Sequence, residues 1–253
     1  MNEAARTGLG LLVLVVVAGV VPLVDGVRQA RMVVWSAGRG AVQLLTVGLV
    51  LVAVFRAPVA VLPVLTVMAV AATATVTPRL AELPVREWWR RPAAVAVAVT
   101  SGAAVTATVV FGTGALPFGV RNVVAVGGIT LGGAMTASTL AGRRFLAELR
   151  GRRAEVEGKL ALGATMRQAT ADLVGVAVGE ALVPALDQTR TTGLVTLPGA
   201  FVGALFGGAS PLTAARFQLV VLVGLLAAES VAAVVLLRLL AAVPFLPITA
   251  AER

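Results

Sequence analysis

Two charged side chains, Glu229 and Arg39, fall inside long apolar segments of this 253-residue chain. Glu229 is the only carboxylate well inside a strongly apolar run, and such acids mark ion paths, proton relays or partners of a buried arginine. Arg39 lies about 10 Å into another apolar run at the helical rise per residue. It shares one helix face with Trp35 and Gln43, each four residues away. One interpretation is a polar path through the membrane. The other is structural: Glu229 pairs with Arg39 or Arg238, or Arg39 reaches the lipid headgroups.

A possible helix break follows at Thr196-Leu197-Pro198-Gly199, inside a further apolar stretch. Proline removes a backbone N–H and disturbs the preceding turn, whereas glycine tolerates unusual backbone angles. Carbonyls freed at membrane depth can coordinate a cation where they line a cavity. We therefore place Thr196, Pro198 and Gly199, with the carboxylate of Asp187, on the candidate translocation path. A simple packing kink is the alternative, and the metal ligands stay undetermined because these positions form no spaced cluster.

A charged amphipathic segment separates the fifth apolar stretch from the sixth. Phe145, Leu149, Val156 and Leu160 recur at near-helical spacing among arginines and glutamates. Gly163 then offers a helix C-terminus, and Thr165 with Gln168 forms the sequence pattern of a capping box for a new helix. The spacing predicts a helix–break–helix element that suits insertion into a groove on a partner protein. An ordinary solvated hairpin is the alternative.

Apolar stretches of membrane-spanning length recur along the whole chain. A hydrocarbon core about 30 Å thick needs about 20 apolar residues in a helix, and the stretches are too long and continuous for barrel strands. We predict an all-α polytopic bundle of about seven transmembrane helices. The predicted spans are Gly8–Val24, Val34–Phe55, Pro58–Thr77, Ala93–Gly114, Phe118–Gly142, Gly193–Ala209 and Ala215–Val243. The first is expected to be an uncleaved span rather than a signal peptide, because no small-x-small cleavage site precedes Asp25.

Basic residues gather in alternate loops and so predict the orientation. The odd loops hold Arg28, Arg31, Arg79, Arg86, Arg90, Arg91, Arg143, Arg144, Arg150, Arg152, Arg153, Lys159, Arg167 and Arg190. Loops two and four hold Arg56 and Arg121, and Arg216 lies just past loop six. The odd loops are therefore predicted to be cytoplasmic, with the N-terminus outside and the C-terminus inside.

Composition excludes several kinds of site. The chain is 58% hydrophobic and 13% charged, carries a formal net charge of +9, and contains no cysteine, histidine or tyrosine. Disulfides, His or Cys metal sites and Ser–His or Cys–His nucleophile pairs are therefore impossible within it. Its positive charges separate lipid-length segments, which indicates membrane topology rather than nucleic-acid binding.

Several stretches agree with a known family in order and spacing. They are Trp35–Arg39 with Gln43, Leu44 and Gly48; Glu157–Thr165 with Gln168 and Ala169; Leu182–Pro184 with Asp187; and Thr192–Gly199 with Gly203, Gly207, Pro211 and Gln218. Between Trp35 and Leu240 the chain resembles the iron-export ABC permeases (FetB-like permeases), which are related to plant aluminium-tolerance half-transporters. The run Gly-Leu-Val-Thr-Leu-Pro-Gly is a specific match.

The chain departs from that family's pattern at a few positions. Gly132-Gly133-Ala134-Met135 stands where the family usually reads Gly-Asn-x-Met, and Gly175 and Gly179 replace arginines. Ser210 replaces an aspartate, and Glu229 stands where a small residue is more usual. These changes bear on the substrate more than on the architecture.

The resemblance implies the permease subunit of an ABC transporter, exporting a metal ion such as iron or a related small solute. It implies a multi-pass protein of the plasma (inner) membrane that pairs with a second copy of itself and with a cytoplasmic ATPase. ATP and Mg²⁺ would bind in that ATPase, which fits the lack of a Gly-x-x-x-x-Gly-Lys-Ser/Thr motif here. The chain itself is expected to have no enzymatic activity and no cofactor of its own. The residues implied to contact the ATPase are Glu157, Lys159, Leu160, Leu162, Gly163, Ala164, Thr165 and Gln168.

The sequence predicts one permease domain over residues 1–253, with a cytoplasmic coupling segment at about 143–190. Three other functions stay open. A proton-coupled secondary transporter would use Glu229 and would need no ATPase. Export of an anionic solute such as a sugar nucleotide would suit the excess of arginine over acid. A regulatory membrane subunit would have no transport path.

Overall fold

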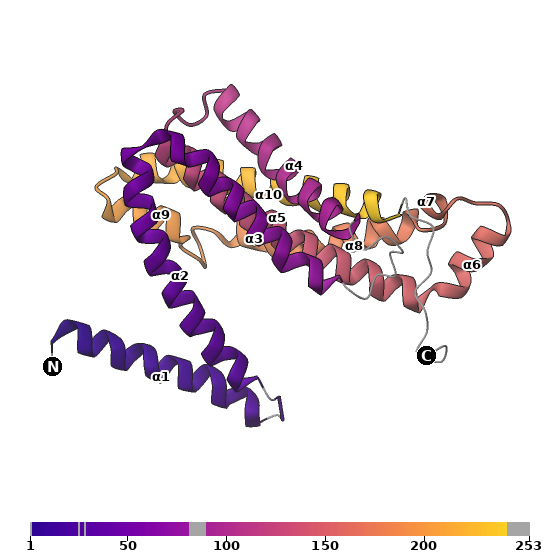
Figure 1. Ribbon diagram of the computed structural model, residues 1–253, viewed down its shortest axis with the longest axis horizontal. Helices are drawn as coiled ribbons and strands as arrows, with labels where there is room; N and C mark the ends of the chain where they lie inside the picture. The colour runs from indigo at the N-terminus through magenta and orange to yellow at the C-terminus, as the bar shows by residue number, and fades with distance from the viewer. Residues whose placement is uncertain (1, 25, 28, 81–89, 242–253) are drawn as a thin grey trace. The chain divides into compact units, whose positions relative to one another are not determined.

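The computed structural model describes residues 2–24, 26–27, 29–80 and 90–241 (Figure 1). Asp25, Arg28 and Arg86, which entered the predictions on the first span and on orientation, lie outside the described residues. Regular structure in the described part is helical, apart from one isolated bridge between Thr192 and Thr196. Two compact units, Met1–Ala60 and Val61–Arg253, are described separately below.

Where the structure describes the first unit, it consists of two long helices and one short helix. Helix α1 spans Glu3–Val24, α2 spans Ala30–Arg56, and a 3-10 turn, η1, spans Pro58–Ala60. Helices α1 and α2 pack against each other, yet most of their leucines and valines are exposed, with Leu44 76% exposed, and Val54 is the only valine or leucine of the two helices described as buried. An apolar surface of this extent is stable against lipid or another protein surface rather than against water.

The described residues of the second unit, 61–80 and 90–241, form eight helices. They are α3 (Val61–Arg79), α4 (Arg90–Gly112), α5 (Val120–Gly151), α6 (Arg153–Ala161), α7 (Met166–Ala169), α8 (Ala171–Thr191), α9 (Gly199–Phe206) and α10 (Pro211–Ala241). Helix α10 packs on α4, α5 and α8, and α5 also packs on α3. The shared core contains valine, leucine and many alanines, because short side chains let long helices approach closely.

Glycines set the closest approaches between these helices and show how the helices run. A Cβ at Gly102 of α4 would collide with the carbonyl oxygen of Ala228 on α10. One turn further along α4, the Thr106 hydroxyl donates to the carbonyl of Gly224, 3.1 Å away. Since 102 faces 228 and 106 faces 224, α4 and α10 are antiparallel. These contacts bring the backbone of α4 close to the backbone of α10, and such close approach at small residues stabilises helix packing in lipid.

Six described helical segments are long and apolar enough to cross a membrane, so the predicted polytopic helical fold is confirmed. They are Ala5–Val24, Ala30–Arg56, Pro58–Arg79, Arg90–Gly112, Val120–Gly151 and Pro211–Ala241. The predicted span Gly193–Ala209 is wrong. Residues 192–198 are not helical, and α9 has 8 residues, which is too short for a hydrocarbon core. The sidedness derived from the basic residues stays a prediction.

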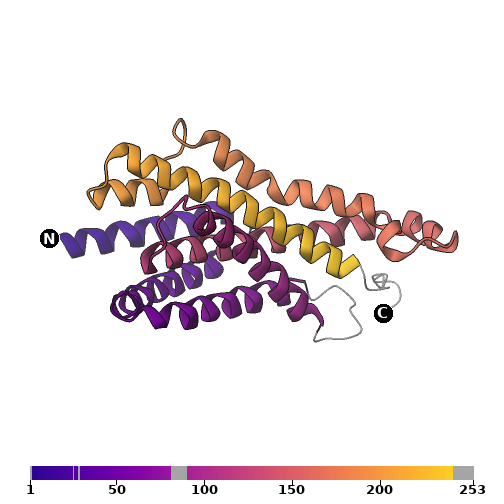
Figure 2. The same ribbon diagram turned by 90° about the horizontal axis from the view of Figure 1, so that it is seen from above.

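Helix α8 occupies a place that the sequence analysis assigned to the cytoplasmic segment at 143–190. It has 21 residues, about 31 Å at the helical rise, and it lies along α10 in both views (Figure 2). Its buried face carries Leu173, Ala177, Ala181 and Ala185. The hydropathy pattern left this segment unassigned because Asp172, Glu180 and Asp187 interrupt it; in the structure all three are exposed.

Candidate functional site

The predicted break between two helices is present at Gly163. This residue has φ +90°, in the left-handed region that favours glycine. The Gly163 N–H donates to the Leu160 carbonyl at 2.9 Å, and the Ala164 N–H donates to the Lys159 carbonyl at 3.1 Å. This pair of hydrogen bonds is a Schellman motif, which satisfies the free carbonyls at the end of α6. The chain therefore turns sharply without leaving the helix end unsatisfied.

The predicted capping box at the start of α7 is also present. Thr165 accepts a hydrogen bond from the Gln168 N–H at 3.3 Å through its hydroxyl. Its own N–H donates to the Gln168 side-chain oxygen at 2.8 Å. This reciprocal arrangement defines the start of a helix of only 4 residues. We name the segment from Arg153 to Ala169, which contains α6 and α7, the α6–α7 hairpin.

One side of the α6–α7 hairpin is anchored and its tip is free. Val156, Met166 and Ala169 are buried and belong to the same core cluster as Leu173 of α8. Leu162 at the tip is 91% exposed. Phe145 and Leu149, predicted to lie on the same amphipathic segment, are instead buried at the end of α5. The hairpin thus presents an apolar side chain outward from a base that packs into the helix bundle.

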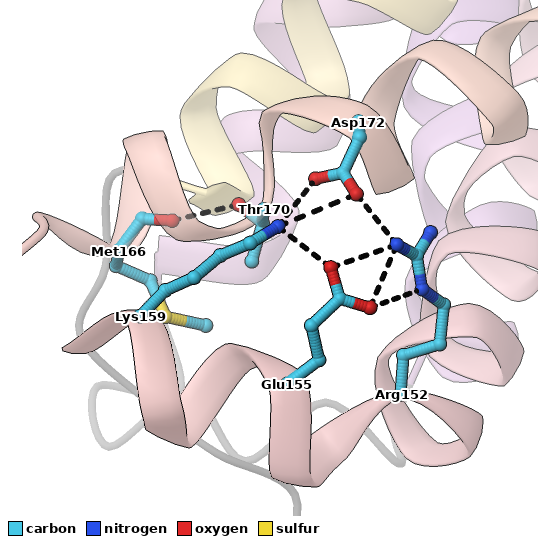
Figure 3. A network of polar contacts seen from close by, with 6 residues as sticks. All are labelled: Arg152, Glu155, Lys159, Met166, Thr170 and Asp172. Atoms are coloured by element: carbon cyan, nitrogen blue, oxygen red, sulfur yellow. Dashed lines mark hydrogen bonds and ion pairs between the residues drawn. The ribbon is translucent and has the colours of Figure 1, made fainter. Parts of the chain in front are cut away.

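A network of four charged side chains ties this hairpin to the first turn of α8 (Figure 3). Arg152 contacts Glu155 at 2.8 Å and Asp172 at 2.7 Å. Lys159 contacts Glu155 at 2.8 Å and Asp172 at 3.3 Å. We call Arg152, Glu155, Lys159 and Asp172 the charged clamp. Both ends of α6 are therefore connected to one carboxylate on α8, and the Thr170 hydroxyl beside it donates to the Met166 carbonyl at 2.8 Å.

The charged clamp shifts the titration of its members in the directions expected for ion pairs. Hydrogen bonds from Lys159 and Arg152 hold the pKa of Glu155 below its ordinary value of 4.5. The hydrogen bond to Glu155 raises the pKa of Lys159 above 10.5. The clamp is consequently fully charged at neutral pH. The sequence analysis assigned only Lys159 to the site, although the spacing of Arg152, Glu155 and Lys159 at three and four residues was a usable signal.

Other members of the predicted coupling set lie on or near the hairpin surface. Glu157 pairs with Arg153 one turn away, at 2.6 Å. Leu160 and Ala164 are half-buried. A separate ion pair, which sequence reasoning missed, joins Arg144 of α5 to Glu180 of α8 at 2.8 Å. The coupling residues are thus brought together as one element, whose role stays a prediction.

The predicted polar face of α2 belongs to the first unit. Trp35, Arg39 and Gln43 line a hollow of about 1310 Å³, and every described lining residue belongs to α2. This face is open on the side away from the helix. This position fits both interpretations of Arg39: its side chain could line a polar path through the membrane, or it could reach the lipid headgroups.

Glu229 is buried on α10, with 7% of its surface exposed. A Cβ added at Gly133 of α5 would lie 2.7 Å from a Glu229 carboxyl oxygen. Within the described part of the chain, Glu229 has no hydrogen-bond or ion-pair partner, so the structural alternative in which it pairs with Arg238 is not observed. Arg39 lies in the other unit, so that pairing stays a prediction.

The remaining predicted path residues lie at or beyond the end of α8, away from the hairpin. Asp187 is exposed in the last turns of α8, Thr196 is exposed in the following loop, and Pro198 and Gly199 begin α9. The predicted break exists, but it lies between two helices and not inside a continuous span. In the described residues between 2 and 241, no three Asp or Glu side chains lie close enough together to hold a metal ion.

Comparison with known proteins agrees with this architecture. Residues 8–245 match the family described as "Uncharacterised protein family (UPF0014)". The chain is 32% identical over 230 residues to "Probable iron export permease protein FetB" of Escherichia coli (strain K12), covering 88% of this chain and 85% of that protein. No solved structure matches it.

Two plant proteins are similar over a shorter part. Identity is 39% over 139 residues to "UPF0014 membrane protein STAR2" of Oryza sativa subsp. japonica, covering 55% of this chain and 49% of that protein. It is 35% over 138 residues to "Protein ALUMINUM SENSITIVE 3" of Arabidopsis thaliana, covering 54% and 50%. The resemblance found in the sequence motifs is confirmed, and the chain belongs to the UPF0014 family of multi-pass membrane proteins.

Proposed function

We propose that this protein is the permease subunit of an ABC transporter and is driven by a separate cytoplasmic ATPase. The observation that carries the proposal is the α6–α7 hairpin. Its tip is exposed at Leu162, its turn is fixed by Gly163 and Thr165, and its base is buried and clamped to α8. A short rigid element of this kind can dock in a groove of a soluble subunit and move as one body.

Two routes could carry movement of the hairpin into the helix bundle. The charged clamp connects α6 to Asp172 on α8. The buried side chains of Val156 and Met166 connect the hairpin to the core shared by α5, α8 and α10. Closure of the ATPase pair would then bias the bundle between inward-open and outward-open packings, because packed helices switch between discrete arrangements.

This mechanism needs a topology with the hairpin on the cytoplasmic side. We propose seven crossings, formed by the six apolar helices and α8, with the N-terminus outside and the C-terminus inside. In this arrangement α8 leaves the cytoplasmic surface at Asp172 and reaches the outer surface near Thr191. One seven-helix chain is too small to enclose an alternating-access path above two ATPases. We therefore propose a homodimer in the plasma (inner) membrane, with ATP and Mg²⁺ bound by the partner.

We propose export of a metal ion as the transport reaction. The support is the likeness to a protein whose name states iron export. Carboxylate and carbonyl oxygens suit hard cations, and the candidate ligands on the proposed path are Glu229, Asp187 and the carbonyls around Thr196, Pro198 and Gly199. Export of an anionic solute is the competing proposal, since the arginines, including Arg39, outnumber the acids.

A proton-coupled transporter is a second candidate because one observation favours it. The Glu229 carboxyl is buried against Gly133 and has no polar partner among the described residues. A buried carboxyl without a partner favours its protonated form, as proton carriers in membranes do. This candidate requires transport by the chain alone, without a nucleotide-binding subunit.

The deciding experiment is co-purification of an ATPase, followed by ATP hydrolysis with and without this chain in proteoliposomes. We expect stimulated hydrolysis and ATP-dependent export of Fe²⁺. Gly163→Val should uncouple hydrolysis from transport, because φ +90° strains any residue with a Cβ. Gly158→Ala is the matched control, since it adds a methyl group to α6 with nothing within 4 Å. Transport without any ATPase, or unchanged coupling in Gly163→Val, would reject the proposal.

A further inference from the structure

The connection between α8 and α10 is a long stretch without charged residues. Residues 191–215 include no Asp, Glu, Lys or Arg, and they are flanked by Arg190 and Arg216. Helix α9, inside this stretch, consists only of glycine, alanine, valine, leucine and phenylalanine, and its 8 residues cannot cross a hydrocarbon core. An uncharged apolar segment that is too short to span a bilayer is typical of an element that enters one leaflet and returns.

The side chains of this connection are exposed rather than packed inside the protein. We name residues 192–198 the apolar loop. Within it, Leu194 is 91% exposed and Val195 is 79% exposed, and Phe206 at the end of α9 is 88% exposed. None of the residues of α9, all of which the structure describes, is buried. An apolar surface of this kind requires lipid or another protein surface.

The backbone of the apolar loop is largely satisfied by the loop itself. The N–H groups of Leu194, Val195 and Thr196 all donate to the Thr191 carbonyl, at 3.2, 2.9 and 3.3 Å. The Gly193 N–H donates to the Thr196 carbonyl at 2.9 Å, and Gly193 has φ +88°, which this tight turn requires. Because these N–H groups are already paired, the loop loses few hydrogen bonds on leaving water.

The start of α9 limits how deep this connection can enter. The N–H groups of its first turn, at residues 199–201, have no acceptor within the helix, and among the described residues no side chain caps them. Unpaired N–H groups are costly in hydrocarbon but find acceptors in water and in headgroup oxygens. The connection therefore fits the boundary between hydrocarbon and headgroups rather than the centre of the bilayer.

The apolar loop lies at the end of the bundle opposite the α6–α7 hairpin (Figure 1). Helix α9 packs on α10 and is joined to it by residues 207–210, so the two helices are antiparallel neighbours. Eight residues of helix measure about 12 Å, and the same length of α10 from Pro211 passes the exposed Arg216. The apolar loop is thus level with an arginine that suits the headgroups. Leu212 and Leu219, exposed on α10 at this level, extend the lipid-facing surface of α10 to the loop.

We propose that the apolar loop and α9 insert into the membrane leaflet opposite the α6–α7 hairpin. The side chains of Leu194, Val195 and Leu197 would lie among the acyl chains, with the start of α9 at the headgroups. The partner is the phospholipid bilayer, and no particular headgroup is needed because residues 191–215 carry no charge. This insertion would hold one end of α8 in its leaflet while the charged clamp joins the other end to the hairpin. The inference is independent of the ATPase partner, of the substrate and of which leaflet is cytoplasmic.

The test measures the surroundings of a single nitroxide on the full chain in phosphatidylcholine vesicles. The chain has no native cysteine, so Leu194→Cys gives one labelling site. Paramagnetic resonance then compares collisions with oxygen, which concentrates in the bilayer, and with a water-soluble nickel chelate. Leu162→Cys is the matched control, because Leu162 is also 91% exposed but lies at the tip of the charged hairpin. We expect a ratio of oxygen to nickel collisions that is several-fold higher at 194 than at 162.

A second pair of variants tests whether the apolar side chains cause the insertion. With the label on Val195→Cys, Leu194→Asp/Leu197→Asp should lower the ratio several-fold, because carboxylates are expelled from hydrocarbon. Leu194→Ile/Leu197→Ile should keep the ratio of the parent. All these side chains are exposed, so the variants should fold.

Three results would overturn the proposal. Frequent nickel collisions at 194 would place the loop in water. Rare collisions with both reagents at 194 would show that protein covers the loop, either another part of this chain or a second copy. An unchanged ratio in the Asp variant would show that the apolar side chains do not hold the loop in the leaflet.

Discussion

The carboxyl group of Glu229 on α10 lies against the backbone of Gly133 on α5. A Cβ at position 133 would come within 2.7 Å of a Glu229 oxygen and would collide with a methyl group of Leu225. The missing side chain of Gly133 is therefore what makes room for a carboxyl group between two packed helices. Glu229, the one acid that is buried among the described residues, and a glycine 96 residues earlier in the chain form a single structural feature.

Gly133→Ala should destabilise the protein by about 1–3 kcal/mol, the usual cost of overpacking a helix interface. The added methyl group must displace the Leu225 methyl group or the Glu229 carboxyl group, and Glu229 is buried with little space to move. Gly132→Ala is the matched control: it lies next to Gly133 on the same helix with nothing within 4 Å, and alanine favours a helix over glycine. Thermal unfolding in detergent, followed by circular dichroism, measures both. A control that unfolds as early as Gly133→Ala would contradict this account of the contact.

Glu229→Gln should leave thermal stability unchanged or slightly higher. The substitution keeps the shape of the side chain and removes only its ability to ionise, and no ion pair is lost among the described residues. In an ATP-driven permease, transport should not depend on a pH gradient in the parent or in this variant. A parent flux that follows the imposed pH gradient, and that disappears in Glu229→Gln with folding intact, would instead support the proton-coupled candidate. Fe²⁺ flux into proteoliposomes with and without an imposed pH gradient separates the two.

Thr165→Ala should loosen the α6–α7 hairpin by about 1 kcal/mol, the typical cost of removing an N-cap side chain. Helix α7 has only 4 residues, so the cap hydrogen bonds make up a large part of the hydrogen bonds that stabilise it. Thr165→Ser is the control because serine keeps the accepting hydroxyl. Hydrogen exchange of the Gln168 amide, which the cap protects, should speed up in Thr165→Ala and stay near the parent rate in Thr165→Ser. Equal exchange rates in all three proteins would rule out this role for the cap.

The charged clamp should hold α6 across a wide pH range and release it only at the extremes. Glu155 has a folded pKa below 4.5, so its contribution is present above that pH and is lost as the pH falls through the lowered value. Lys159 has a folded pKa above 10.5, so its contribution is present below that pH and is lost as the pH rises through the raised value. A spin label on Leu162→Cys, in a chain without native cysteine, should report constant mobility between about pH 5 and 10 and greater mobility outside it.

Asp172→Asn should increase the mobility of the same spin label at neutral pH. The substitution removes the carboxylate that joins Arg152 and Lys159 to α8. Asp187→Asn removes an exposed carboxylate from the other end of α8 and should leave the label unchanged. Mobility that rises equally in both variants would show that the label senses the charge of α8 in general and not the clamp.

Several local features could be predicted from the sequence because neighbouring residues determine them. Gly163 ends α6 and the pair Thr165 and Gln168 begins α7, as predicted, since both motifs are closed by hydrogen bonds within six residues. The apolar spans were recognisable for a related reason: each needs only its own length and composition to be stable in lipid. By contrast, α8 was left unassigned because three acids, Asp172, Glu180 and Asp187, interrupt an otherwise apolar segment.

The sequence by itself determined that this protein lies in a membrane, where six of its membrane helices lie, and to which family it belongs. Such properties depend on runs of adjacent residues, and no tertiary contact is needed to establish them. Only the tertiary structure decided that Glu229 faces Gly133 and that Asp172 joins both ends of α6. The physical reason is that each of these relationships depends on which faces of two helices meet and at what register. That register is set by close packing of small residues, and a face of small residues does not specify which other helix it meets.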